Sequence, residues 1–272
     1  MNGLMNKSVA LFFLILSLAS PQSFAELEVF PHRIVFEPGK RSAEVILKNT
    51  GTSTASYRMG WNDIVYDSNL NAKQIDEDEG LRKTPAASSM IRFAPRQVVI
   101  APGESQSVRM RLRRPKDISS GEYRSHFLFQ EESDALPRKK VTSGSAVQVV
   151  LKVGMTIPLV VRIGKGQPEL AIKHAQVQPP TSRYPHGLLV MELERSGDYG
   201  LYMDTTLAFK DNGDTINAIH AKGRGLYTDT NQYKVRLALR ESPESGQPLQ
   251  LTLSYAQRNG EIREINTPLQ MP

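Results

Sequence analysis

The segment from Val147 to Val161 reads VQVVLKVGMTIPLVV and alternates apolar with mixed residues throughout. Its apolar row is unbroken and consists of Val147, Val149, Leu151, Val153, Met155, Ile157, Leu159 and Val161. A period of two is typical of a β-strand, whose successive side chains point to opposite faces. Because strands usually have roughly five or six residues, this segment predicts one overlong strand at the centre of an all-β fold.

Shorter alternating segments lie on both sides of this strand. We expect strands at 43–49, 90–100, 107–112, 123–129, 188–193, 203–209, 232–239 and 249–255. Pro102-Gly103 and Asn259-Gly260 supply turns between them. Short strands with this spacing are typical of β-sandwiches. The Gly- and Pro-containing stretch 164–168 resembles a linker, so we expect one domain at 26–163 and a second at 164–272.

The N-terminus carries an export signal. Lys7 precedes an apolar run at 8–20, and Ser23-Phe24-Ala25 places small residues at the two positions that signal peptidase reads. We therefore expect residues 1–25 to be a signal peptide that is cleaved after Ala25. The alternative, a membrane anchor, would need about 20 apolar residues, so we expect an exported protein with no membrane insertion.

Composition excludes several kinds of function. There is no cysteine among the 272 residues, which rules out disulfides, thiolate metal sites and thiol nucleophiles. The five histidines form no local pair that would suggest a metal site, and no cofactor motif is present. Lys+Arg 34 against Asp+Glu 28 gives 34 − 28 = +6, too small and scattered an excess to indicate nucleic acid. No catalytic motif for a hydrolase occurs, so we expect no enzyme. Trp61 is expected in a sandwich core and His126 in a structural role.

The overlong strand has two interpretations. In the first it is a central strand whose apolar row belongs to the core. In the second, part of it is a sheet edge that is lent to a partner as an added strand. A long apolar edge is an aggregation hazard unless function requires it, and the alternating pattern by itself favours the central strand.

Three motifs change that balance. PHRIVF at 31–36, PRQVVIAPGESQSVR at 95–109 and GEYRSH at 121–126 resemble the periplasmic chaperones of the chaperone–usher pathway that assembles pili. The resemblance implies two immunoglobulin-like β-sandwich domains in an angled, boomerang-like arrangement. It also implies a long strand in the first domain that completes a pilin or fimbrial subunit and is exchanged at an outer-membrane usher. In its GEYRSH block and its lack of cysteine, the sequence resembles the divergent archaic or alternative branches of this family more than the best-known branch.

Site residues follow from this resemblance. The donor strand would present Val147, Val149, Leu151, Val153 and Met155. Arg33 matches the basic residue that holds the subunit's C-terminal carboxylate, whereas Pro158 stands where a second anchor, a lysine, is expected. Arg124 and Lys152 are the candidates to replace that lysine. The alternative interpretation of each is an ordinary surface residue whose charge is solvated by water.

The resemblance also bears on the domain interface. Arg162 matches an arginine that joins the two domains, but Ser125 stands where its glutamate partner is expected, and the sequence offers no evident aspartate partner. A homodimer that caps the free donor strands stays open, as does the identity of the subunit served. The rival class is a secreted structural or adhesive β-sandwich protein of the cell surface.

Overall fold

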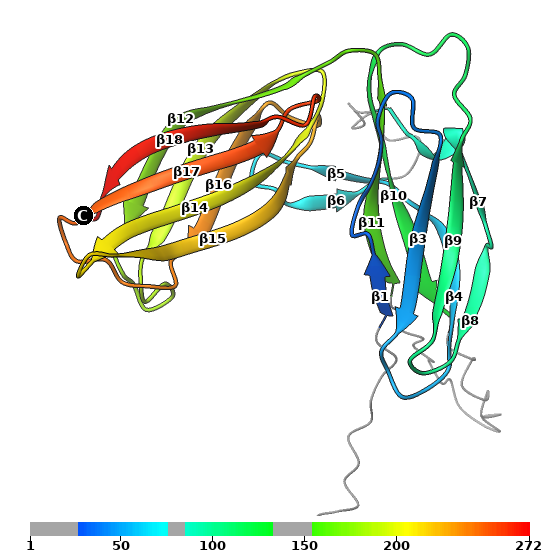
Figure 1. The fold of residues 1–272 in the computed structure, drawn as a ribbon, viewed down its shortest axis with the longest axis horizontal. Coiled ribbons are helices and arrows are strands. Elements are labelled where there is room, and N and C mark those ends of the chain that lie inside the picture. Colours follow the sequence, from blue (N-terminus) through cyan, green and yellow to red (C-terminus); the bar gives the residue numbers. More distant parts are fainter. Residues whose placement is uncertain (1–26, 76–84, 133–153) are drawn as a thin grey trace, which may run out of the picture.

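The computed structural model describes residues 27–75, 85–132 and 154–272. These ranges contain β-strands and one short 3₁₀ turn, η1 (Ser88–Met90), and no α-helix. Figure 1 shows two sandwiches set at an angle to each other and joined at one end. The predicted all-β fold of two β-sandwich domains is confirmed. In the described part of the chain no helix is long and apolar enough to cross a membrane.

The first sandwich consists of a four-stranded and a five-stranded sheet. The order in the first sheet is β1 (Leu27–Phe30), β3 (Ser42–Asn49), β9 (Ser105–Leu112) and β7 (Ile91–Ala94). The order in the second is β2 (Ile34–Phe36), β11 (Gly154–Ile163), β10 (Gly121–Glu131), β4 (Ala55–Asn62) and β8 (Gln97–Ile100). Neighbouring strands are antiparallel, except that β2 runs parallel to β11. Residue alternation produces the core, because every second side chain points between the sheets.

Large apolar side chains fill the space between these two sheets. Phe36, Leu47, Phe127 and Leu159 are completely buried there. Trp61 is partly buried and packs edge-on against Phe127, with 5.1 Å between the ring centroids. Trp61 is therefore a core residue, as its position in the sequence suggested.

The N-terminal segment changes sheets within a few residues. β1 pairs with β3 in the first sheet, and β2 pairs with β11 in the second. Pro31 stands between the two short strands and has no N–H to donate, which suits a position where pairing with one sheet ends. As a consequence, the cover that β2 gives to β11 is only three residues long.

The second sandwich begins where β11 has ended at Ile163. Gly164, at a φ of 95°, starts the connection, because this backbone conformation favours glycine. One sheet has the order β12 (Pro168–Gln178), β13 (Leu188–Gly197) and β16 (Gln232–Ala238). The other has the order β15 (Asp214–Leu226), β14 (Leu201–Asp211), β17 (Pro248–Ala256) and β18 (Ile262–Gln270). Its core is separate from the first and is built from residues of both sheets.

One expected strand proved to be two. The segment 90–100 is interrupted at Pro95, so that Ile91–Ala94 joins one sheet as β7 and Gln97–Ile100 joins the other as β8. Eight strands had no sequence prediction: β1, β2, β4, β12, β15 and β18, together with β5 (Ile64–Tyr66) and β6 (Ala72–Gln74). Most of them are short or carry polar residues in both rows. The residues predicted as signal peptide, and the part of the overlong strand before Gly154, lie outside the described ranges.

A hairpin of the first half reaches the second sandwich. It consists of β5 (Ile64–Tyr66) and β6 (Ala72–Gln74) and extends from the first domain toward the second in Figure 1. The amide of Lys234 on β16 donates to the carbonyl of Ser68 at 2.6 Å. Leu70 at its tip has a φ of 63° and packs against the second core. Because an apolar residue at this φ is unfavourable, that packing stabilises the tip on the second domain.

Candidate functional site

The candidate site is an edge of the five-stranded sheet that is only partly covered. On one side, β11 pairs with β10 over its whole length, from Gly154 opposite Gln130 to Ile163 opposite Gly121. On its other side, β2 pairs only with Leu159–Val161. Among the described strands none pairs with Gly154–Pro158 on that side. Pro158 fits such a place, because proline within a sheet is confined to edges and strand ends.

The apolar row of β11 leaves the core at the same end. Ile157, Leu159, Val161 and Ile163 belong to the first core and are at most 6% exposed. Met155 continues their row but is 40% exposed. The strand therefore presents an apolar side chain to solvent where its edge is uncovered. The four preceding members of the predicted donor row, Val147, Val149, Leu151 and Val153, lie outside the described residues.

Arg33 lies next to this edge and faces the second domain. It directly precedes β2, and its guanidinium carbon is 4.0 Å from the centroid of the Tyr202 ring on β14. Stacking on an aromatic face is favourable for a guanidinium and leaves its N–H groups available. Arg33 is exposed, and it makes no ion pair within the described ranges. It therefore supplies an uncompensated positive charge between the domains.

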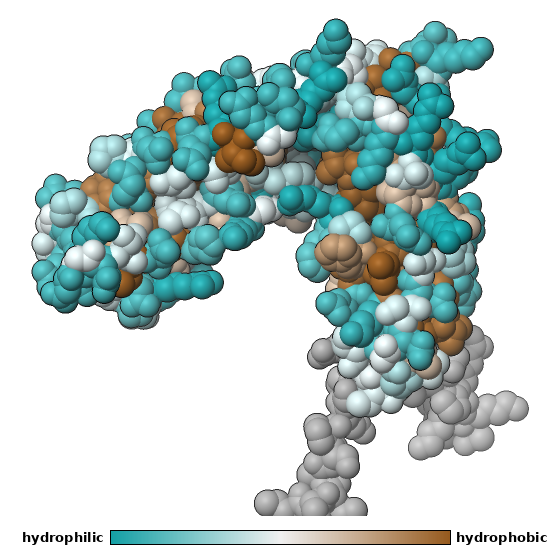
Figure 2. Space-filling view, in the orientation of Figure 1, coloured by the Kyte–Doolittle hydropathy of each residue, from teal (hydrophilic) through white to brown (hydrophobic). Residues whose placement is uncertain are grey.

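Tyr202 forms the wall against which Arg33 stacks. Burial, together with the nearby Glu122 carboxylate, raises the pKa of Tyr202 to about 12, although Arg33 acts in the opposite direction. The phenol is therefore neutral at physiological pH. Figure 2 shows the hollow between the two domains, with hydrophobic side chains gathered on the part of the first domain that borders it.

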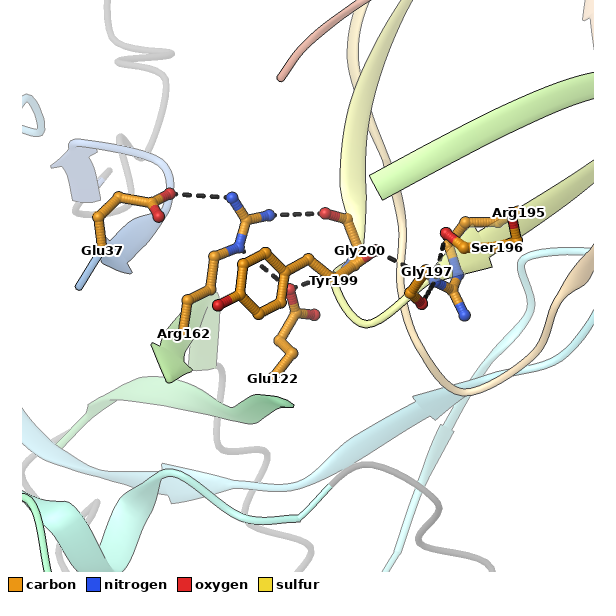
Figure 3. A network of polar contacts seen from close by, with 8 residues as sticks. All are labelled: Glu37, Glu122, Arg162, Arg195, Ser196, Gly197, Tyr199 and Gly200. Atoms are coloured by element: carbon orange, nitrogen blue, oxygen red, sulfur yellow. Dashed lines mark hydrogen bonds and ion pairs between the residues drawn. The ribbon is translucent and has the colours of Figure 1, made fainter. Parts of the chain in front are cut away.

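A polar network around Arg162 also joins the two domains (Figure 3). The guanidinium of Arg162 donates to Glu37 at 2.9 Å and to Glu122 at 3.3 Å, both in the first domain. It also donates to the carbonyl of Gly200 in the second domain at 2.6 Å, and the amide of Gly200 donates to Glu122 at 2.9 Å. Glycine is favoured at position 200, because a Cβ there would lie 2.9 Å from the backbone carbonyl oxygen of Leu226 as well as 2.9 Å from Oε1 of Glu122.

The second domain holds its side of this network rigidly. Arg195, which is 3% exposed, donates to the carbonyls of Gly197 and Tyr199 at 2.8 and 3.1 Å. It also donates to the side chain of Asn231 at 2.6 Å. These bonds fix the turn that carries Gly200, and Arg162 stacks over the Tyr199 ring at 5.0 Å from the centroid.

A second, more deeply buried ion pair joins the domains through Arg124. Arg124 and Asp229 pair with only 2% and 4% of their side chains exposed. Arg124 also donates to the carbonyl of Ile64 at 3.1 Å and lies 4.2 Å from the centroid of the Tyr227 ring. Tyr66 stacks on Tyr227, and its amide donates to Asp229 at 3.0 Å. The hairpin β5–β6 is thus part of the same interface.

The structure of this chain is similar to solved structures of chaperones. A chaperone–tip adhesion subunit complex of the archaic Csu pili of Acinetobacter baumannii matches at 16% identity and a TM-score of 0.44, over 91% of this chain and 100% of that chain. The Escherichia coli chaperone DraB matches at 14% identity and a TM-score of 0.43, over 90% and 97%. The Pseudomonas aeruginosa chaperone CupB2 matches at 10% identity and a TM-score of 0.44, over 89% and 100%. No family model matches the sequence, and no curated protein does.

The contacts and burial in the structure divide the predicted site residues into three groups. Arg33 and Met155 are exposed on the first domain, at the uncovered end of β11 and beside it. Arg162 contacts the second domain, in the position expected for an interface arginine. Arg124 is buried in its pair with Asp229, so a carboxylate from a partner does not reach it, and we no longer retain it as an anchor. Lys152 lies outside the described residues.

The acidic interface residues were missed by the sequence analysis. The glutamate partner of Arg162 was expected at Ser125 and no aspartate was evident, whereas the structure has Glu122 beside Arg162 and Asp229 beside Arg124. Glu122 stands in the GEYRSH motif, and its place opposite Arg162 depends on the register between β10 and β11. The hydroxyl of Ser125 instead accepts from the amides of Ala87 and Ser88 at 3.2 and 3.1 Å.

Proposed function

We propose that this protein is a periplasmic chaperone that holds a pilus or fimbrial subunit on the edge of β11 and delivers it to an outer-membrane usher. The observation that carries the proposal is the uncovered edge at Gly154–Pro158, from which the apolar row leaves the core at Met155. An added strand pairs with such an edge through its backbone, as chaperone–pilin complexes are known to do. The sequence motifs at 31–36, 95–109 and 121–126 support the same role.

The donor row supplies the affinity in this proposal. Each buried Val, Leu or Met side chain contributes about 1.5–3 kcal/mol. Four members of the row Val147–Met155 would contribute roughly 6–12 kcal/mol before the costs of association are subtracted. A free energy of this size is large enough to hold a subunit. Replacement of the donor strand by another strand that fits the subunit better would still lower the free energy.

Arg33 would hold the C-terminal carboxylate of the subunit. A carboxylate that leaves water needs charge-assisted donors, which the planar guanidinium provides in pairs. Arg33 is exposed beside the uncovered edge and is oriented by the Tyr202 ring. Lys152, in the donor segment, is the remaining candidate for the second basic group, because Pro158 occupies the expected lysine position.

The interface would keep the two walls of this site in fixed relation. Arg162 and Arg124 each bond to groups of both domains, and both are mostly or fully buried. A subunit that contacts both domains then binds without a cost for ordering them. The proposed role needs no catalytic group and no cofactor.

The proposal is tested by native mass spectrometry of the protein isolated from the periplasm of its own cells. We expect a one-to-one complex with a small β-rich subunit. Leu151→Arg, in the donor row, should abolish the complex and leave the chaperone folded. Gln148→Arg, which adds the same charge to the opposite row, is the matched control and should leave the complex intact.

The other outcomes have definite meanings. A subunit still held by a folded Leu151→Arg variant would refute the donor strand. A homodimer that dissociates on the same substitution would support self-capping by the donor segment. A bare monomer under conditions in which pili are made would instead favour the secreted structural or adhesive surface protein.

A further inference from the structure

Exposed cations gather on the outer face of the sheet β1-β3-β9-β7 and on the loops at its end. We call this surface the basic groove, and it consists of Lys40, Arg41, Arg92, Arg109, Arg111, Arg113, Arg114 and Lys116. These residues line two adjoining hollows of about 570 and 880 Å³, and Arg41 and Arg111 belong to both. The cations of the basic groove lie on the sheet opposite the one that contains β11 and on the loops at its end, and β11 lines the larger hollow only through Arg162 and Ile163.

The strand register brings like charges together in this groove. Arg92 on β7 stands directly opposite Arg111 on β9, and both are exposed on the same face. Like charges at directly paired positions destabilise a sheet. This arrangement therefore does not serve the folding of the sheet, and a ligand that neutralises both charges would relieve it.

Acidic groups of the described residues do not compensate these charges. Glu44 is 3.6 Å from Arg109, in a pair whose side chains are 49% and 86% exposed. Glu37 lines the larger hollow but is bound to Arg162. The other seven cations make no ion pair in the parts of the chain that the structure describes. On the second domain, by contrast, the exposed Lys173 and the half-buried Lys234 each pair with a glutamate.

The chemistry of the groove favours an extended acidic peptide over a simple anion. Six of its eight cations are arginines, whose forked guanidinium binds carboxylates in bidentate fashion. Arg109 and Arg111 are two residues apart on one strand, a separation of about 6.8 Å, which is also the repeat of alternate side chains in an extended peptide. Phe93 and Leu112, which are half-buried, add apolar surface to the lining.

We propose that the basic groove binds an extended acidic segment of a partner protein, in which Asp or Glu alternates with apolar residues. The carboxylates would bind the arginines, and the apolar side chains would contact the lining between them. The cross-strand pair Arg92–Arg111 would be the centre of the contact. This site does not depend on the predicted donor row Val147–Met155, because its cations lie on the opposite sheet and its loops, and β11 reaches the lining only at its far end, Arg162 and Ile163.

The test measures binding of a fluorescein-labelled peptide, GELEVELEG, by anisotropy, with GQLQVQLQG as its neutral counterpart. We expect the acidic peptide to bind, the neutral one not to bind, and the affinity to fall as salt is raised. Arg92→Gln/Arg111→Gln should weaken binding at least tenfold. Arg236→Gln/Arg240→Gln on the second domain removes the same charge from two exposed arginines without described ion pairs and should leave binding unchanged.

Several results would overturn the proposal. An equal loss of peptide binding in both double variants would indicate that the peptide is attracted only by the net positive charge of the protein. Binding to phosphatidylglycerol vesicles without binding to the peptide would indicate an anionic lipid surface as the ligand. Peptide binding that appears only after Asp76, Glu77, Asp78 and Glu79 are replaced by their amides would assign the groove to the chain's own acidic run. A thermal scan checks folding, and the Arg92→Gln/Arg111→Gln variant should melt no lower than the parent protein.

Discussion

Replacing Arg124 by methionine tests whether the buried ion pair holds the two domains together. Methionine keeps an unbranched apolar stem but leaves the carboxylate of Asp229, whose side chain is 4% exposed, without its guanidinium partner. Removing one partner of a buried pair costs about 3–5 kcal/mol. The amide of Tyr66 still donates to Asp229 at 3.0 Å, so we expect the lower end of this range, about 3 kcal/mol.

The loss is measured by urea unfolding, with the fluorescence of Trp61 reporting on the first domain. Lys173→Met is the matched control, because Lys173 and Glu194 form a pair in which 60% and 41% of the side chains are exposed. Such surface pairs contribute at most about 1 kcal/mol. Arg124→Met/Asp229→Leu should recover part of the stability, because the double variant leaves no unpaired charge.

Hydrogen exchange shows where in the molecule the Arg124→Met substitution acts. The amide of Tyr66 binds Asp229 and that of Lys234 binds Ser68, so both should exchange faster in Arg124→Met if the hairpin detaches. A stability loss below about 1 kcal/mol, with unchanged exchange at these two amides, would refute the assignment of this pair as the link between the domains.

Three further predictions follow from the same geometry. Arg33→Ala should weaken a subunit complex at least tenfold in dissociation measurements while Arg33→Lys retains part of the affinity, because a desolvated carboxylate loses its donors; an unchanged complex would move the anchor elsewhere. Because burial raises the pKa of Tyr202 to about 12, the unfolded state releases this proton first, and stability should fall between pH 10 and 12 by up to about 1.4 kcal/mol per unit. Urea unfolding at several pH values should show a shallower fall in Tyr202→Phe, and parallel curves would contradict the assignment. Leu70→Ala should speed exchange in the hairpin without changing exchange in the first core, since its side chain packs on the second domain; unaltered exchange would mean that polar contacts suffice.

The sandwich architecture was predictable because it depends on local alternation. The row that ends at Val161 has a period of two in the sequence, and Ile157, Leu159 and Val161 are buried in the structure. Turn residues such as Asn259-Gly260 also act locally: Gly260 has a φ of 84° in the turn between β17 and β18. Such signals need no knowledge of which strands become neighbours.

The contacts between domains were not predictable in the same way. Glu122 meets Arg162 because of the register between β10 and β11, and Asp229 meets Arg124 through the approach of a distant turn. Arg124 was expected to be accessible to a ligand, because a strand pattern does not show which polar residue lies under a second domain. The hairpin β5–β6 was not predicted either, since each of its strands has only three residues.

This hairpin defines what can be exchanged or expressed as a unit. Residues 64–74 belong to the first half of the chain, yet Leu70 packs against the second core and the carbonyl of Ser68 accepts from Lys234 on β16. A fragment that starts at Gly164 would therefore lack part of its own packing, although its strands are contiguous in sequence. A chimera that takes its second domain from another protein would need a hairpin matched to it, so the modular boundary in three dimensions includes a segment nearly one hundred residues upstream of the linker.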